Sequence, residues 1–100
     1  MQKLLEETKE KAYIFLREFG FEEDELEPVI NKGLKELEES LVDLLKLINS
    51  ESIEYTYVDT ALHDLKGLLF QLGNHNAANK VELLRHVKSI DEIKNWIENL

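Results

Sequence analysis

The chain has 100 residues, of which 43% are hydrophobic, no cysteine and a formal net charge of −9. This length and composition indicate one packed domain, residues 1–100, and exclude disulfide bridges and thiolate zinc sites. The acidic balance disfavours nucleic acid and membrane surfaces as partners, and the lack of a long apolar run or a signal-peptide pattern predicts a cytoplasmic protein.

Apolar residues recur three and four positions apart along most of the chain, a spacing that predicts an all-α fold. The first helix is expected over residues 2–19, with a left-handed stop at Gly20. The second is expected from near Pro28 to residue 49, because proline is best tolerated in the first turn of a helix. The expected buried stripes of these two helices are Leu5, Thr8, Ala12, Phe15, Leu16 and Phe19, and Ile30, Leu34, Leu37, Leu41, Leu44, Leu45 and Ile48.

The third helix is expected to begin at a cap on Ser50 or Ser52 and to end before Gly73. A fourth should follow residues 74–76, and a capping box at residues 89–92 should open a short fifth helix. Short loops between such helices favour an antiparallel four-helix bundle with an additional short helix, and the first helix is expected to act as a cover. The apolar positions of the last two helices are Ala77, Val81, Leu84 and Val87, and Ile90, Ile93, Trp96, Ile97 and Leu100.

His63 lies opposite the apolar stripe when the third helix is drawn on a helical wheel, so it is expected to point outward. Lys66 and Gly67 lie within about 60° of it, as does Phe70. Glycine in the middle of a helix costs about 1 kcal/mol relative to alanine, which is understandable if a partner approaches the backbone closely there. Lys66 places an ammonium beside any anion held on the imidazole, and Phe70 exposes an aromatic ring. These residues together predict a functional face.

The stretch from His63 to Gly73, which reads HDLKGLLFQLG, resembles the histidine-containing phosphotransfer (HPt) family. The motif of that family is H-x-L-K-G with a second glycine ten residues after the histidine. The matching residues are His63, Leu65, Lys66, Gly67 and Gly73. The chain departs from the family at Leu68 and Leu69, where Ser or Ala is usual. The resemblance covers most of the chain and implies an HPt-like four-helix bundle.

The resemblance implies that His63 accepts a phosphoryl group through Nε2 in a two-component phosphorelay. The donor would be the aspartyl phosphate of a receiver domain, on a response regulator or a hybrid histidine kinase, and a second receiver would take the group on. Lys66 would stabilise the phosphoryl oxygens, and Gly67 would clear space for the receiver. The Mg²⁺ ion belongs to the receiver, so no cofactor is expected on this chain. Such a protein is a phosphocarrier and hardly an enzyme by itself.

Further residues are placed by helical spacing. Asp59 lies one turn before His63, where its carboxylate could accept the Nδ1 proton and fix the tautomer, the alternative being a plain solvated aspartate. Phe70 and Gln71 would supply contact area to the receiver. The histidines lack the spacing of a di-iron bundle, so no metal site is expected. The alternative function is a diverged, non-catalytic module that binds a receiver or a partner helix without phosphotransfer.

Overall fold

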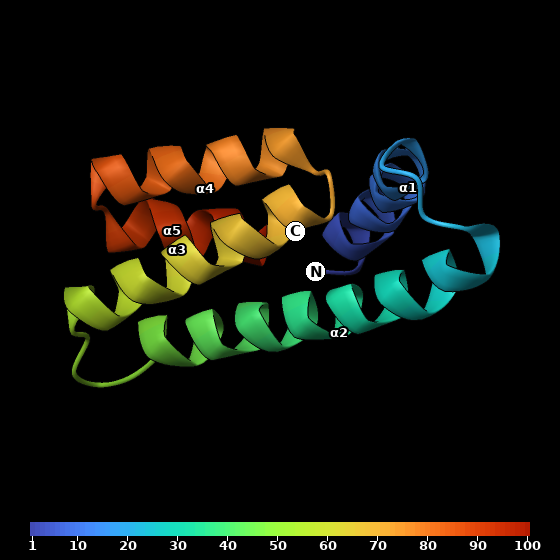
Figure 1. Ribbon diagram of the computed structural model, residues 1–100. Coiled ribbons are helices and arrows are strands. Elements are labelled where there is room, and N and C mark those ends of the chain that lie inside the picture. The colour runs from blue at the N-terminus through green and yellow to red at the C-terminus, as the bar shows by residue number, and fades with distance from the viewer.

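The computed structural model describes all 100 residues and contains five α-helices and no strand (Figure 1). The helices are α1 (Gln2–Glu18), α2 (Glu23–Ile48), α3 (Tyr55–Gln71), α4 (His75–Val87) and α5 (Ile90–Glu98). The prediction of an all-α fold is therefore confirmed. None of the five helices combines the length and the apolar character needed to cross a bilayer.

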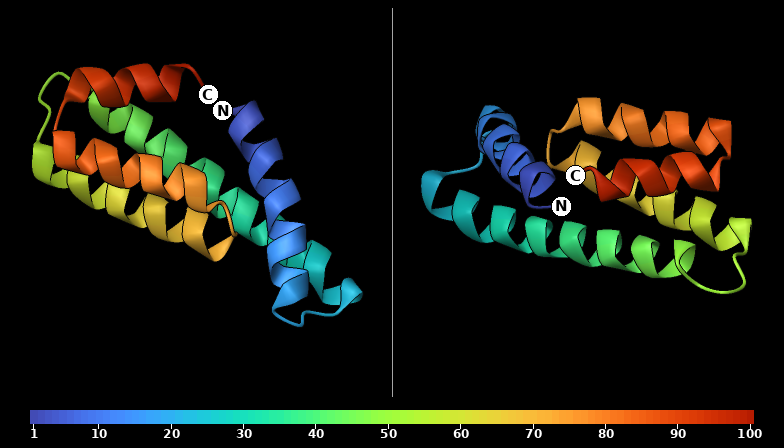
Figure 2. Two further views of the ribbon diagram at one scale, coloured as in Figure 1. Left: turned by 90° about the horizontal axis from the view of Figure 1, so that it is seen from above. Right: turned by 180° about the vertical axis from the view of Figure 1, so that it is seen from behind.

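Helices α2, α3, α4 and α5 lie side by side, and each runs opposite to the one before it in the chain (Figures 1 and 2). The pairs in contact include α2 with α3, α3 with α4, and α2 with α5. Helix α1 crosses the N-terminal half of α2 at an angle, and the two ends of the chain lie close together (Figure 2). The molecule is elongated, with extents of 45 × 22 × 20 Å.

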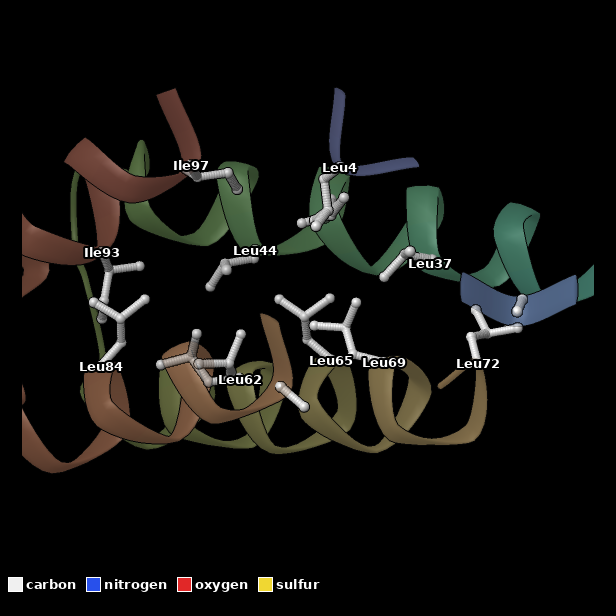
Figure 3. Close-up of a cluster of buried hydrophobic side chains, with 14 of the residues drawn as sticks. Leu4, Leu37, Leu44, Leu62, Leu65, Leu69, Leu72, Leu84, Ile93 and Ile97 are labelled. Atoms are coloured by element: carbon white, nitrogen blue, oxygen red, sulfur yellow. The ribbon is translucent and has the colours of Figure 1, made fainter. Parts of the chain in front are cut away.

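The core is a single cluster of 19 buried hydrophobic residues, most of them leucine. Figure 3 shows Leu62, Leu65 and Leu69 of α3 pointing toward Leu37 and Leu44 of α2. All five are fully buried, and burial of each such side chain is worth about 1.5–3 kcal/mol. The buried residues of α3 form one apolar stripe, and the opposite face of the helix is oriented toward solvent.

The start of α2 differs from the prediction, because the helix begins at Glu23 rather than near Pro28. The carboxylate of Glu25 accepts the backbone N–H of Glu22, which precedes the helix. Three acids in the first turn also interact favourably with the helix dipole. These interactions stabilise a start upstream of Pro28, which therefore lies inside the helix and removes only one hydrogen bond there.

The start of α3 also differs, because it begins at Tyr55 and not at a serine cap. The Ser50 hydroxyl lies 3.0 Å from the carbonyl oxygens of Leu47 and Ser52 and so belongs to the loop. Helix α4 begins slightly earlier than predicted, at His75. The stops at Gly20 and Gly73 (φ +95° and +79°) and the cap of α5 by Ser89, which accepts the N–H of Glu92, are confirmed.

Two predicted core positions are wrong. The fully buried residues of α1 follow four-residue steps and are Leu4, Thr8, Ala12 and Leu16. Phe19 falls outside this series, is 71% exposed and lies after the last helical residue. Val87, in the last turn of α4, is 52% exposed.

A buried polar side chain fixes α1 against the turn between α3 and α4. Asn74 is fully buried, and its side-chain amide donates to the hydroxyl of Thr8 at 2.8 Å. Its carbonyl oxygen accepts the N–H of Ala77 at 3.3 Å and caps α4. Lys11 donates to the same oxygen at 3.4 Å. These bonds hold the middle of α1 beside the turn that follows the C-terminal end of α3.

Candidate functional site

His63 is exposed on α3, on the face opposite the leucine stripe, as its position on the helical wheel predicts. Its Nδ1 lies 3.4 Å from Nη1 of Arg85 on α4, a long hydrogen bond. A guanidinium has donors only, so in this contact Nδ1 is the acceptor and carries no proton. Sequence spacing does not indicate this contact, because the two residues come from different helices.

Arg85 is held in place by Asp59, which lies one turn before His63. Its Nε and Nη2 donate to the two carboxylate oxygens of Asp59 at 3.1 and 3.4 Å. The hydrogen bond from Arg85 lowers the pKa of the Asp59 carboxyl, and the same bond raises the pKa of the Arg85 guanidinium. The backbone carbonyl of Arg85 accepts from the hydroxyl of Tyr55 at 3.2 Å. The carboxylate of Asp59 therefore faces Arg85, and Arg85 is the group that meets Nδ1 of His63.

Lys66 is paired with Glu82, on the neighbouring turn of α4. Its Nζ lies 3.0 Å from Oε2 of Glu82 and 5.9 Å from the ring centroid of Phe70. The same Oε2 accepts from Nη1 of Arg85 at 3.1 Å, and Oε1 lies 3.3 Å from Nε2 of His86. The hydrogen bond from Lys66 is the main cause that lowers the pKa of the Glu82 carboxyl. The carboxylate of Glu82 thus pairs with two basic side chains, Lys66 of α3 and Arg85 of α4, and Arg85 also contacts His63.

Gly67 has no packing role within the chain. A Cβ atom added there would meet nothing within 4 Å. At Gly33, by contrast, an added Cβ would lie 2.6 Å from Cδ2 of Leu72, so the Leu72 side chain would have to shift. The bare backbone at Gly67 is open to the outside, one turn beyond His63.

An aromatic groove adjoins this face. It has a volume of about 360 Å³ and is lined by Phe15, Leu16, Phe19, Phe21, Phe70 and Gln71. The His75 ring lies between Phe15 and Phe70, with ring centroids 5.3 Å from each. The structure thus brings Phe70 and Gln71, which the sequence nominates for partner binding, together with aromatic residues at the end of α1. Phe19 was expected in the core and instead extends this surface.

Departures from the phosphotransfer motif lie away from this face. Leu69 is fully buried and Leu68 half-buried, and Leu68 lines the junction of α3 with α2. No three His, Cys, Asp or Glu residues cluster in a way that could hold a metal ion. Comparisons with protein-family models, with curated proteins and with solved structures find no match.

Proposed function

We propose that this chain is a histidine phosphotransfer protein that carries a phosphoryl group on His63 between receiver domains. The observation that carries the proposal is an exposed imidazole with two cations beside it, Lys66 and Arg85, and an open backbone one turn away at Gly67. In this proposal α2 to α5 form an HPt-like antiparallel bundle, and α1 covers one end of it.

The proposed phosphoryl transfer requires only that the carrier position the imidazole and place positive charge near it. The lone pair of Nε2 attacks phosphorus in line, and the N–P bond forms as the P–O bond to the receiver aspartate breaks. The electron pair of that bond leaves with the carboxylate. Charge on the equatorial oxygens has to be neutralised in such a loose transition state. Lys66 and Arg85 supply cations from this chain, while Mg²⁺ and the acidic pocket belong to the receiver.

The contact from Arg85 sets a condition on this attack. With Nδ1 unprotonated, a neutral imidazole carries its proton on Nε2, whose lone pair is then not free. The contact between the guanidinium and Nδ1 therefore has to break, so that the ring proton can move from Nε2 to Nδ1 and leave the lone pair of Nε2 free. An arriving phosphoryl group is an anion that competes for the same N–H donors, so its approach favours release of Nδ1.

A two-stage relay tests the proposal. A Mg²⁺-loaded receiver domain carrying labelled aspartyl phosphate is mixed with this chain, which is then purified and offered to a second, unlabelled receiver. We expect label on the chain after the first step and on the second receiver after the next. A chain that never takes label from any receiver that it binds contradicts the proposal.

The aromatic groove favours a second candidate, a non-catalytic module that binds a receiver or a partner helix. Its exposed Phe19, Phe21 and Phe70 offer apolar area independent of the imidazole. Receiver binding by calorimetry, unchanged by His63→Gln and accompanied by no label, would favour this candidate.

A further inference from the structure

We propose that Glu82 is an internal substitute for the phosphoryl anion: it holds Lys66 and Arg85 ready beside His63 and is displaced from them when His63 is phosphorylated. This inference rests on the proposed function and adds to it a residue that sets how tightly the carrier keeps its phosphoryl group. Nothing in the sequence motif points to Glu82, because it lies on α4.

Two cations from different helices converge on one carboxylate oxygen. Nζ of Lys66 lies 3.0 Å from Oε2 of Glu82, and Nη1 of Arg85 lies 3.1 Å from it. The same Nη1 lies 3.4 Å from Nδ1 of His63. Only one guanidinium nitrogen therefore separates the carboxylate from the imidazole. Phosphorylation of His63 would place anionic oxygens on the same face as the donors that Glu82 now occupies.

The remaining contacts of Arg85 allow such an exchange. Its Nε and Nη2 are held by Asp59, while Nη1 serves both Glu82 and His63. Because the guanidinium is planar and rigid, Nη1 keeps its place while Asp59 holds Nε and Nη2, so the exchange proceeds by rotation of the Glu82 and His63 side chains around it. Lys66, with four rotatable bonds, needs only a side-chain rotation. Asp59 is in this view a positioning residue that keeps Arg85 over α3 throughout the exchange.

Charge balance makes the exchange matter for transfer. Lys66 and Arg85 match Asp59 and Glu82 one for one before phosphorylation, and the phosphoryl group adds excess negative charge. Glu82 then competes with this group for the cations and repels it. A phosphocarrier must also release the phosphoryl group that it accepts. Competition from Glu82 would prevent Lys66 and Arg85 from binding that group too tightly. Removal of the Glu82 charge should therefore favour the phosphorylated state.

The experiment measures phosphoryl exchange with a small probe, N-phosphoimidazole. Its N–P bond breaks and the electron pair stays on the imidazole nitrogen, which takes a proton. The lone pair of Nε2 of His63 forms the new N–P bond with the ring proton on Nδ1, and loss of that Nδ1 proton balances the proton that imidazole takes. Bonds of the same type break and form, so the equilibrium constant reports the protein environment. NMR correlation between phosphorus and the ring protons quantifies phosphorylation at His63 itself.

Glu82→Gln should raise this equilibrium constant about three- to fivefold, the range expected from loss of one partly exposed ionic partner. Onward transfer to a receiver should slow in parallel. Glu82→Asp, which keeps the charge, should stay close to wild type. Glu38→Gln is the matched control, because it removes one acid from the exposed side of α2 and should leave the constant unchanged.

Different results overturn different claims. An equilibrium constant for Glu82→Gln equal to that of wild type, with His63 phosphorylated in both, overturns the inference and leaves the proposed function standing. A lower melting temperature of Glu82→Gln with an unchanged equilibrium constant also overturns the inference. Glu82 would then only stabilise the packing of α4 against α3. Failure of wild-type His63 to take any phosphoryl group overturns both.

Discussion

Nη1 of Arg85, on α4, lies 3.4 Å from Nδ1 of His63, on α3, and joins two side chains 22 residues apart in sequence. Since the guanidinium can only donate, the contact defines a tautomer in which the proton of a neutral imidazole sits on Nε2. Asp59, which holds the other two nitrogens of Arg85, is thereby kept from the imidazole. In the proposed phosphotransfer, the protonation of the attacking ring nitrogen would thus depend on a residue of the neighbouring helix.

The first prediction concerns this tautomer. Arg85→Met removes the donor at Nδ1 and frees the carboxylate of Asp59, which can then accept a hydrogen bond from Nδ1–H. We expect ¹⁵N NMR of the imidazole at pH 8 to show mainly Nε2–H in wild type and a shift toward Nδ1–H in the variant. Arg17→Met, which breaks an ion pair with Glu23 far from His63, serves as the control. An identical tautomer population in all three proteins would rule out control by Arg85.

The second prediction separates stability from docking at Gly67. Gly67→Ala should raise the free energy of unfolding by about 1 kcal/mol, because alanine is the better helix former and its Cβ meets nothing. It should nevertheless slow phosphotransfer, since the added methyl lies where the receiver approaches. Gly73→Ala is the contrasting variant and should destabilise by at least about 1 kcal/mol, because Gly73 has φ +79°. Faster or unchanged transfer by Gly67→Ala would show that no partner approaches there.

The third prediction concerns the aromatic groove. Phe19→Ala and Phe70→Ala should each weaken receiver binding about five- to tenfold, as expected when an exposed aromatic anchor is lost from an interface. Phe19 is 71% exposed, so its replacement should leave the melting temperature almost unchanged. Ile14→Ala, at a residue of α1 that is 60% exposed and not part of the groove, is the control. Equal affinities for Ile14→Ala and Phe19→Ala by calorimetry would remove the groove from the docking surface.

The fourth prediction concerns acid stability. The pKa of the Asp59 carboxyl is lowered, first by its hydrogen bond from Arg85, so its contribution to folding is fully present above the ordinary aspartate pKa. That contribution is lost as pH falls through the lowered value in the folded state. Asp59→Asn should therefore be less stable than wild type at pH 7, and the difference should shrink toward pH 2. Denaturant unfolding at several pH values measures the difference in free energy of unfolding between the two proteins. A difference that does not depend on pH would contradict this account.

The exposed face of α3 around His63 was predictable because one helix carries it. The period that buries Leu62, Leu65 and Leu69 also turns His63 and Lys66 outward, so local spacing is sufficient. Glu82 and Arg85 were not predictable, because the rotation and register of α4 against α3 depend on tertiary packing. Their three-residue spacing is the only local signal, and it is common on solvent-exposed helices.

The differences between the predicted and the observed helices have similar causes. The spacing of Phe19 from Phe15 suits a helical stripe and predicts a core position, but the buried series of α1 ends at Leu16 and Phe19 lies after the last helical residue. The preference of proline for the first helical turn predicts a start of α2 near Pro28. The helix starts at Glu23 instead, because a hydrogen bond between Glu22 and Glu25 and the interaction of the acidic first turn with the helix dipole stabilise it there.

The most direct test of the central claim is the site of phosphorylation. Wild type, His63→Gln and His86→Gln are incubated with the same phosphorylated receiver, and the acid-labile label is located by peptide mapping. The account predicts label on His63 in wild type and in His86→Gln, and none in His63→Gln. Label that persists in His63→Gln, or label absent from wild type bound to that receiver, would contradict it.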